Sequence, residues 1–127
     1  MPVLFVSHGA PSFALDAGTS GPALHAWALA LRQRFPVRAV VILSPHWEAV
    51  APTIMATARP KTWHDFGGFA PALYALQYPA AGSPALALEV QTLLRRAGIV
   101  AGLDDARPLD HVAWVPLMHL FPKADIP

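Results

Sequence analysis

The stretch that most constrains the fold of this chain runs from Val40 to Trp47 and reads Val-Val-Ile-Leu-Ser-Pro-His-Trp. Four consecutive apolar residues, three of them β-branched, predict a strand at the centre of a sheet that is covered on both faces. Pro45 cannot donate a ladder hydrogen bond, so the strand should end there. His46 then lies just past the strand end, where open α/β sheets place their ligands.

A second stretch of the same form begins the chain. Residues 2–7 are predicted to form a strand, and Ser7, His8 and Gly9 follow its apolar part. We expect His8 and His46 to meet at one edge of one sheet and to hold a metal, because neutral imidazole is the commonest protein metal ligand. Two histidines do not complete a site, since catalytic metals usually have three protein ligands. From position alone, a metal site and a pair of ordinary loop histidines are equally well supported.

The remaining pattern alternates strands with helices. We expect helices over 22–34, 71–76, 84–97 and part of 110–120, and further strands over 39–44, 52–57 and 99–101. Thr19, Ser20, Ser83 and Asp110 are candidate helix caps. The alternation predicts an α/β fold with a mostly parallel or mixed central sheet flanked by helices on both faces. The strands are few for such a sheet, so it would be incomplete if the chain is a fragment.

Composition excludes several classes of function. Charged residues make up 13% of the 127 residues and hydrophobic residues 54%, which predicts a large buried fraction or a surface that requires a partner. The net charge of +1 offers no basic field for nucleic acid. Cysteine is absent, so any metal site must use His, Asp or Glu. No apolar run is long enough to cross a membrane. The chain begins directly on a predicted strand rather than on a targeting segment, and we predict a cytoplasmic protein.

The other histidines divide into two groups. His64 and Asp65 lie in a long aromatic and glycine-rich loop over 59–69, where they could bind a substrate or cap a turn. His111 follows Asp110, whose carboxylate could tune it, although neighbours in sequence need not face each other. The two histidines without special neighbours, His25 and His119, are predicted to be structural. No nucleophile elbow, P-loop, dinucleotide fingerprint or H-E-x-x-H motif is present, so hydrolase, NTPase and dinucleotide functions lose support.

Five motifs taken together resemble a known family. They are 5–11 (FVSHGAP), 43–47 (LSPHW), 63–69 (WHDFGGF), 77–84 (QYPAAGSP) and 109–117 (LDHVAWVPL). In this order and with these gaps they are similar to the class III extradiol ring-cleavage dioxygenase family, and most of all to its 4,5-DOPA dioxygenase-like branch.

The resemblance implies a site and a reaction. Members hold one non-haem Fe(II), or in some structures Zn(II), and His8 and His46 match two of its ligands. His111 matches an active-site histidine that contacts the catechol or the bound oxygen. His64, and with it Asp65, matches the pocket mouth, which implies substrate binding. The implied reaction inserts both atoms of O₂ beside the vicinal diol of a catechol such as DOPA and opens the ring.

One departure concerns length, because family members are about twice as long. Their third metal ligand and catalytic base lie in the second half, so residues 1–127 resemble the N-terminal portion of a single dioxygenase domain. Two ligands without a third predict weak metal binding and little turnover. The alternatives are an inactive remnant or binding module that retains the fold, and, with less support, a metal-dependent hydrolase. An apolar face left by truncation would favour a homo-oligomer.

Overall fold

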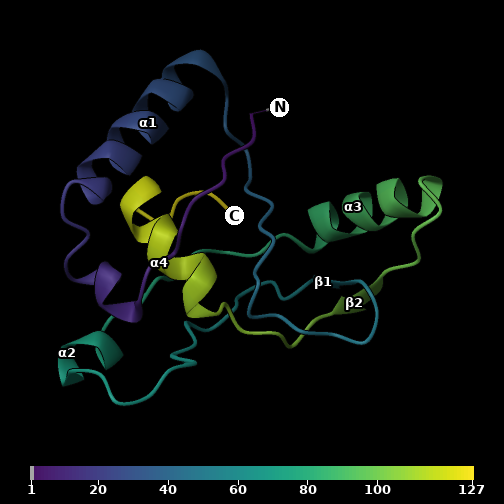
Figure 1. The fold of residues 1–127 in the computed structure, drawn as a ribbon. Coiled ribbons are helices and arrows are strands. Elements are labelled where there is room, and N and C mark those ends of the chain that lie inside the picture. Colours follow the sequence, from purple (N-terminus) through teal and green to yellow (C-terminus); the bar gives the residue numbers. More distant parts are fainter. Residues whose placement is uncertain (1) are drawn as a thin grey trace.

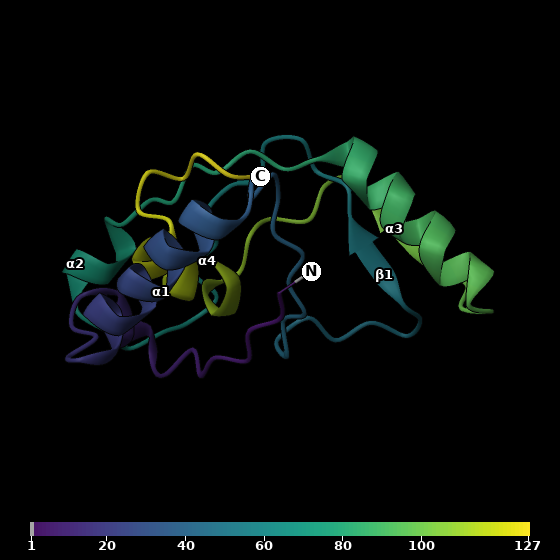
Figure 2. The same ribbon diagram turned by 90° about the horizontal axis from the view of Figure 1, so that it is seen from above.

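The computed structural model describes residues 2–127, which form an α/β fold in two regions (Figure 1). The predicted fold class is therefore confirmed. The first region is helical and contains η1 (Pro11–Ala14), α1 (Ser20–Arg34), α2 (Pro71–Tyr74) and α4 (His111–Leu120). The second contains β1 (Thr53–Met55), β2 (Gly102–Asp104) and α3 (Pro84–Arg96). Two extended segments, 2–10 and 37–44, lie beside these regions in the ribbon views (Figures 1 and 2).

Helix α4 occupies the centre of the core. Trp114 and Val115 are fully buried, and α1 and η1 pack against this helix (Figure 2). Tyr78 is buried in the core, and its hydroxyl donates a hydrogen bond to the Phe121 carbonyl at 2.9 Å. Burial raises the pKa of Tyr78 to about 12. Because α4 is apolar on nearly every side, it has the character of a buried helix rather than an amphipathic surface helix.

Local sequence explains where the helices begin. Ser83 accepts a hydrogen bond from the Leu86 amide and precedes Pro84, the first residue of α3. Asp110 likewise accepts from the Ala113 amide at the start of α4. Both predicted caps are confirmed. The predicted capping at Thr19 is wrong, because its side chain makes no capping hydrogen bond and its backbone is already helical.

The sheet differs most from the prediction. It has two parallel strands, β1 and β2, in which Ile54 lies opposite Leu103. The segment predicted as a strand over 52–57 contains β1, whereas the strand predicted over 99–101 lies three positions later, over 102–104. Helix α3 packs against both strands. The expected central sheet with helices on both faces is therefore not formed among the described residues.

The two apolar segments predicted as central strands are extended but belong to no ladder. Residues 2–7 and 39–44 contain no assigned strand, and the Val40 amide donates to the Pro127 carbonyl at 2.9 Å. Val41 is 61% exposed and Leu43 is 95% exposed, so the prediction that Val40–Leu43 is buried on both faces is wrong. A strand needs a neighbouring strand for its backbone groups, and among residues 2–127 these segments have only isolated contacts such as the one between Val40 and Pro127.

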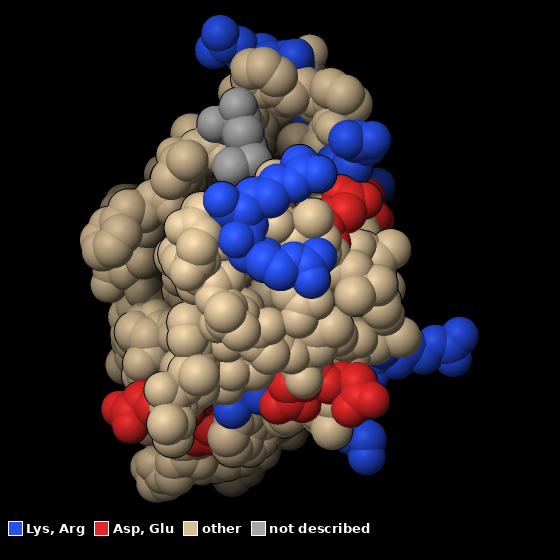
Figure 3. Space-filling model, turned by 90° about the vertical axis from the view of Figure 1, so that its right-hand side faces the viewer, with Lys and Arg blue, Asp and Glu red and all other residues tan. Residues whose placement is uncertain are grey.

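Among residues 2–127, no helix is both long and apolar enough to span a membrane. Charged side chains of both signs are scattered over the face shown in Figure 3, with broad uncharged areas between them. That distribution agrees with the low charged fraction of the sequence.

Candidate metal centre

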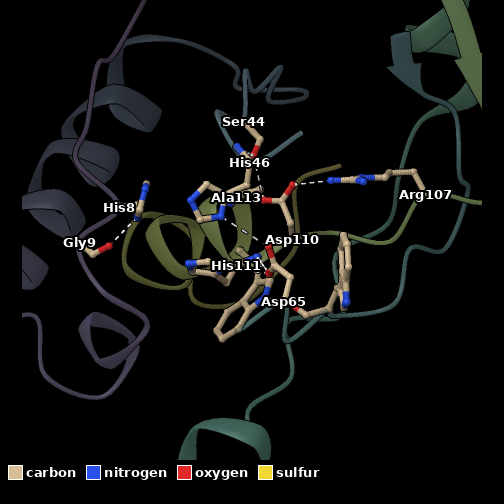
Figure 4. Close-up of polar contacts among 11 residues, drawn as sticks. His8, Gly9, Ser44, His46, Asp65, Arg107, Asp110, His111 and Ala113 are labelled. Carbon is tan, nitrogen blue, oxygen red and sulfur yellow. Dashed lines mark hydrogen bonds and ion pairs between the residues drawn. The ribbon is translucent and has the colours of Figure 1, made fainter. Parts of the chain in front are cut away.

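Three histidine rings from distant parts of the sequence come together between the two regions (Figure 4). The ring centroids of His8 and His46 lie 5.2 Å apart, and that of His111 lies 5.7 Å from His8 and 4.9 Å from His46. The rings are steeply inclined to one another, with interplanar angles of 70–80°. The structure therefore brings together the two predicted metal ligands and the predicted catalytic histidine.

His8 is placed by a tight turn. Its Nδ1 lies 2.6 Å from the carbonyl of Gly9, to which it can donate a hydrogen bond. Gly9 has a φ of +64°, and a Cβ there would lie 3.3 Å from the side chain of Phe13. Glycine is the residue that adopts this backbone conformation without strain. The His8–Gly9 pair thus fixes the direction in which the chain leaves the extended segment.

His46 is tied to the start of α4 through Asp110. The Ser44 hydroxyl donates to Asp110 Oδ1 at 3.0 Å, and the His46 amide donates back to the Ser44 hydroxyl at 3.3 Å. Asp110 itself is buried and also accepts from Arg107 at 3.2 Å. One carboxylate therefore caps the helix that carries His111 and anchors the turn that carries His46.

Asp65 contacts both His111 and His46. Its Oδ1 accepts hydrogen bonds from the His111 amide at 2.9 Å and from His111 Nδ1 at 2.8 Å. Its Oδ2 lies 3.6 Å from His46 Nδ1, a distance suited to an ion pair when the imidazole is protonated. Burial raises the pKa of Asp65, but the hydrogen bonds from His111 outweigh that effect and leave it below the ordinary value.

The side chain of His64 makes different contacts from that of the adjacent Asp65. Its Nε2 lies 3.0 Å from the Leu76 carbonyl, and its ring packs among Phe66, Tyr74 and Trp114. Phe66 also packs edge-on against His111, with ring centroids 5.4 Å apart. His64 thus supports the aromatic layer behind His111, and its predicted role in substrate binding stays a prediction.

Within residues 2–127, His46, Asp65 and His111 form a group whose donor atoms all lie within 4.8 Å of one another. Two imidazoles and one carboxylate are the donor set found in many non-haem Fe(II) oxygenases, and imidazole also suits Zn(II). The His8 ring borders the same group. The residues present therefore fit a divalent metal of this class.

Sequence reasoning missed the partnership of Asp65 with His111. The two residues are 46 positions apart, whereas the adjacent Asp110 turns instead toward Ser44 and Arg107. The sequence signal available was the position of Asp65 in a loop already expected to be functional, but nothing in the spacing indicates its partner.

Comparison with known proteins identifies the family. The family model described as the catalytic LigB subunit of aromatic ring-opening dioxygenase matches residues 2–127. The chain belongs to this family. The predicted resemblance to extradiol ring-cleavage dioxygenases is thereby confirmed.

Curated relatives support the same assignment. A 4,5-DOPA dioxygenase extradiol of Beta vulgaris is 41% identical over 125 residues, which is 97% of this chain and 46% of the relative. A protein of the same name from Escherichia coli is 40% identical over 128 residues, covering 100% of this chain and 45% of the relative. The chain therefore spans about half the length of the curated relatives it matches, and it corresponds to their N-terminal half.

Proposed function

We propose that this chain supplies the metal-binding, N-terminal portion of an extradiol dioxygenase that opens the ring of a catechol with O₂. The observation that carries the proposal is the convergence of His8, His46 and His111 in a member of the ring-opening family. Relatives named 4,5-DOPA dioxygenase make DOPA the first substrate to test. We retain a cytoplasmic location and homo-oligomer formation as predictions of the sequence.

In this proposal His8 and His46 hold the metal, which is Fe(II) or Zn(II). When bound, Fe(II) would supply the Lewis-acid and redox chemistry by which a catechol and O₂ can react. His111 lies beside both ligands and is buried, so its imidazole is placed to exchange a proton with a substrate hydroxyl. Phe66 and the aromatic residues behind it exclude water from the buried side of that ring.

A second candidate is a module that binds metal without turnover. The specific observation in its favour is that donor atoms of His46, Asp65 and His111 lie within 4.8 Å of one another, which suits metal binding without itself supplying a reaction. The family resemblance implies that a third ligand and a base belong to the half that is not matched. In this alternative the histidine group still binds a divalent ion, but no catechol is consumed.

Metal binding is tested first, by titrating Co(II) and Zn(II) into the chain and recording visible absorption and heat. We expect one metal site per chain. His46→Ala should weaken metal binding by roughly 10–100-fold or more, because loss of an outer-shell partner alone has an effect of that size. His25→Ala is the matched control, since His25 lies on α1 and not among the three converging rings. Equal affinity in both variants would remove the proposed ligand.

Turnover is tested by incubating the chain with Fe(II), O₂ and DOPA and following a yellow ring-opened product. Colour from the 127-residue chain supports the dioxygenase directly. Metal binding without colour, combined with colour after a second half from a relative is fused to the C-terminus, supports the proposal that the chain supplies the N-terminal portion of the dioxygenase. Metal binding without colour from either protein favours the module. No colour from either protein contradicts the proposed reaction on DOPA.

A further inference from the structure

We infer that Asp65 is a positioning residue, which holds His111 as the Nδ1–H tautomer and turns its Nε2 toward the gap between His8 and His46. The inference deepens the proposed function, on which its catalytic meaning rests. The geometry itself can be tested without metal, substrate or turnover.

The first support is the way Asp65 contacts His111. A single carboxylate oxygen accepts from the amide and from Nδ1 of the same residue, at 2.9 and 2.8 Å. The amide contact fixes the first residue of α4, and the ring contact fixes the rotation of the side chain attached to it. Because both contacts end on the same oxygen, the ring cannot rotate away without losing one of them.

The second support is the chemistry of the pair. An ionised carboxylate can only accept hydrogen bonds, so Nδ1 must carry the proton in this contact. In a neutral imidazole the other nitrogen, Nε2, then holds a free lone pair. Figure 4 shows Asp65 at the Nδ1 side of the His111 ring and His8 on the opposite side, with His46 near both His111 and Asp65. The lone pair is thus available on the side where the metal and the catechol are proposed to bind.

The third support is the burial of the ring. The His111 side chain is 4% exposed, and Phe66 packs edge-on against it at 5.4 Å. A flipped ring would take Nδ1 away from Asp65 and break the 2.8 Å hydrogen bond to that largely buried carboxylate, which costs free energy. Packing and hydrogen bonding therefore select the same orientation.

The contact between Asp65 and His46 is consistent with this assignment. His46 Nδ1 lies 3.6 Å from the second Asp65 oxygen, beyond normal hydrogen-bond distance. Asp65 therefore contacts His111 strongly through Oδ1 while its Oδ2 faces His46. Outer-shell carboxylates that orient histidines in this way are a recurring feature of metal sites.

The test measures the tautomer directly by two-dimensional ¹H–¹⁵N NMR of the chain labelled at histidine, without metal. It is made at about pH 8, above the usual range of histidine titration. His111→Asn assigns the His111 signals by their loss. In the wild-type chain we expect a protonated Nδ1 and an unprotonated Nε2 as the dominant form. A dominant Nε2–H form in the wild type would overturn the inference, whatever the variants do.

Three variants then separate positioning from general stability. Asp65→Asn removes the charge and can present an N–H to Nδ1, so the Nδ1–H form should lose its dominance. Asp65→Glu keeps an ionised acceptor and should retain that form. Asp125→Asn is the matched control, because Asp125 is exposed and pairs with Arg32 away from the three rings; it should leave the His111 signals unchanged.

A folded Asp65→Asn chain that keeps the Nδ1–H form would contradict the role of Asp65. Dispersion of the backbone amide signals shows whether each variant is folded. If Asp65→Asn does not fold, the inference is tested by comparing wild type with Asp65→Glu. Both retain a carboxylate, so both should show the Nδ1–H form of His111. Loss of dioxygenase activity alone would count against the proposed function and not against this inference.

Discussion

Trp114 is a fully buried residue of α4, and its indole N–H donates to the Trp63 carbonyl at 2.9 Å. Replacing it with phenylalanine removes the donor and leaves a small cavity and an unpaired carbonyl. We predict that Trp114→Phe lowers the free energy of unfolding by about 2–3 kcal/mol. Trp27→Phe is the control, because Trp27 is 36% exposed on α1 and should change stability little. Urea denaturation followed by circular dichroism measures both. Equal losses in the two variants would contradict the central place of Trp114 in the core.

The lowered pKa of Asp65 predicts that the stability of the chain depends on pH. Its pKa in the folded chain is below the ordinary value, so the ionised form favours folding. That contribution is complete above the pKa of the unfolded group, about 3.9, and is lost as pH falls through the lower folded pKa. We therefore expect the stability gap between wild type and Asp65→Asn to be larger at about pH 6 than at about pH 3. Urea midpoints at both pH values measure the gap. A gap that does not narrow in acid contradicts the assignment.

At the scale of elements, the helices could be predicted because their signals are local. Ser83 and Pro84 mark the start of α3 within two adjacent residues, and Asp110 marks the start of α4. The strands could not be predicted in the same way, because a ladder depends on a partner elsewhere in the chain. Residues 2–7 and 39–44 have the apolar, β-branched composition of buried strands, yet among residues 2–127 no strand pairs with them.

The candidate site, too, could be predicted only where the signal is local. The position of His8 and His46 after two extended apolar segments predicted that they would meet, and their rings lie 5.2 Å apart. The pairing of Asp65 with His111 depends on how a loop folds back over α4, across 46 positions of sequence. No local pattern encodes such a contact, so it required the structure.

Helix capping gives a matched pair of variants. Ser83 caps α3 with a hydrogen bond from Leu86, whereas Thr19 precedes α1 without one. We predict that Ser83→Ala destabilises the chain by about 1 kcal/mol, and that Thr19→Ala changes stability by less than half of that. Thermal unfolding of the two variants measures the difference. A loss at Thr19 as large as that at Ser83 would show that the geometry at the start of α1 differs from the one described.

At the scale of the whole molecule, the outstanding feature is exposed apolar surface on the two extended segments. Phe5 is 99% exposed, Leu43 is 95% exposed and Val3 is 85% exposed. The backbone of these segments is extended and lacks ladder partners, so it combines apolar side chains with free hydrogen-bonding edges. Exposed edges of this kind promote pairing with other chains.

We therefore predict that the 127-residue chain self-associates through these segments as its concentration rises. Phe5→Thr combined with Leu43→Thr should shift the association to higher concentration, because it removes apolar area while keeping residues compatible with an extended backbone. Sedimentation velocity over a concentration series measures the shift, and circular dichroism checks that the helices are retained. Leu88→Thr combined with Leu93→Thr is the control, since these leucines are exposed on α3 at 53% and 62%. If the α3 variant alone reduces association, the interface is that helix rather than the extended segments. A wild-type chain that stays monomeric throughout would mean that the free edges are too irregular to pair.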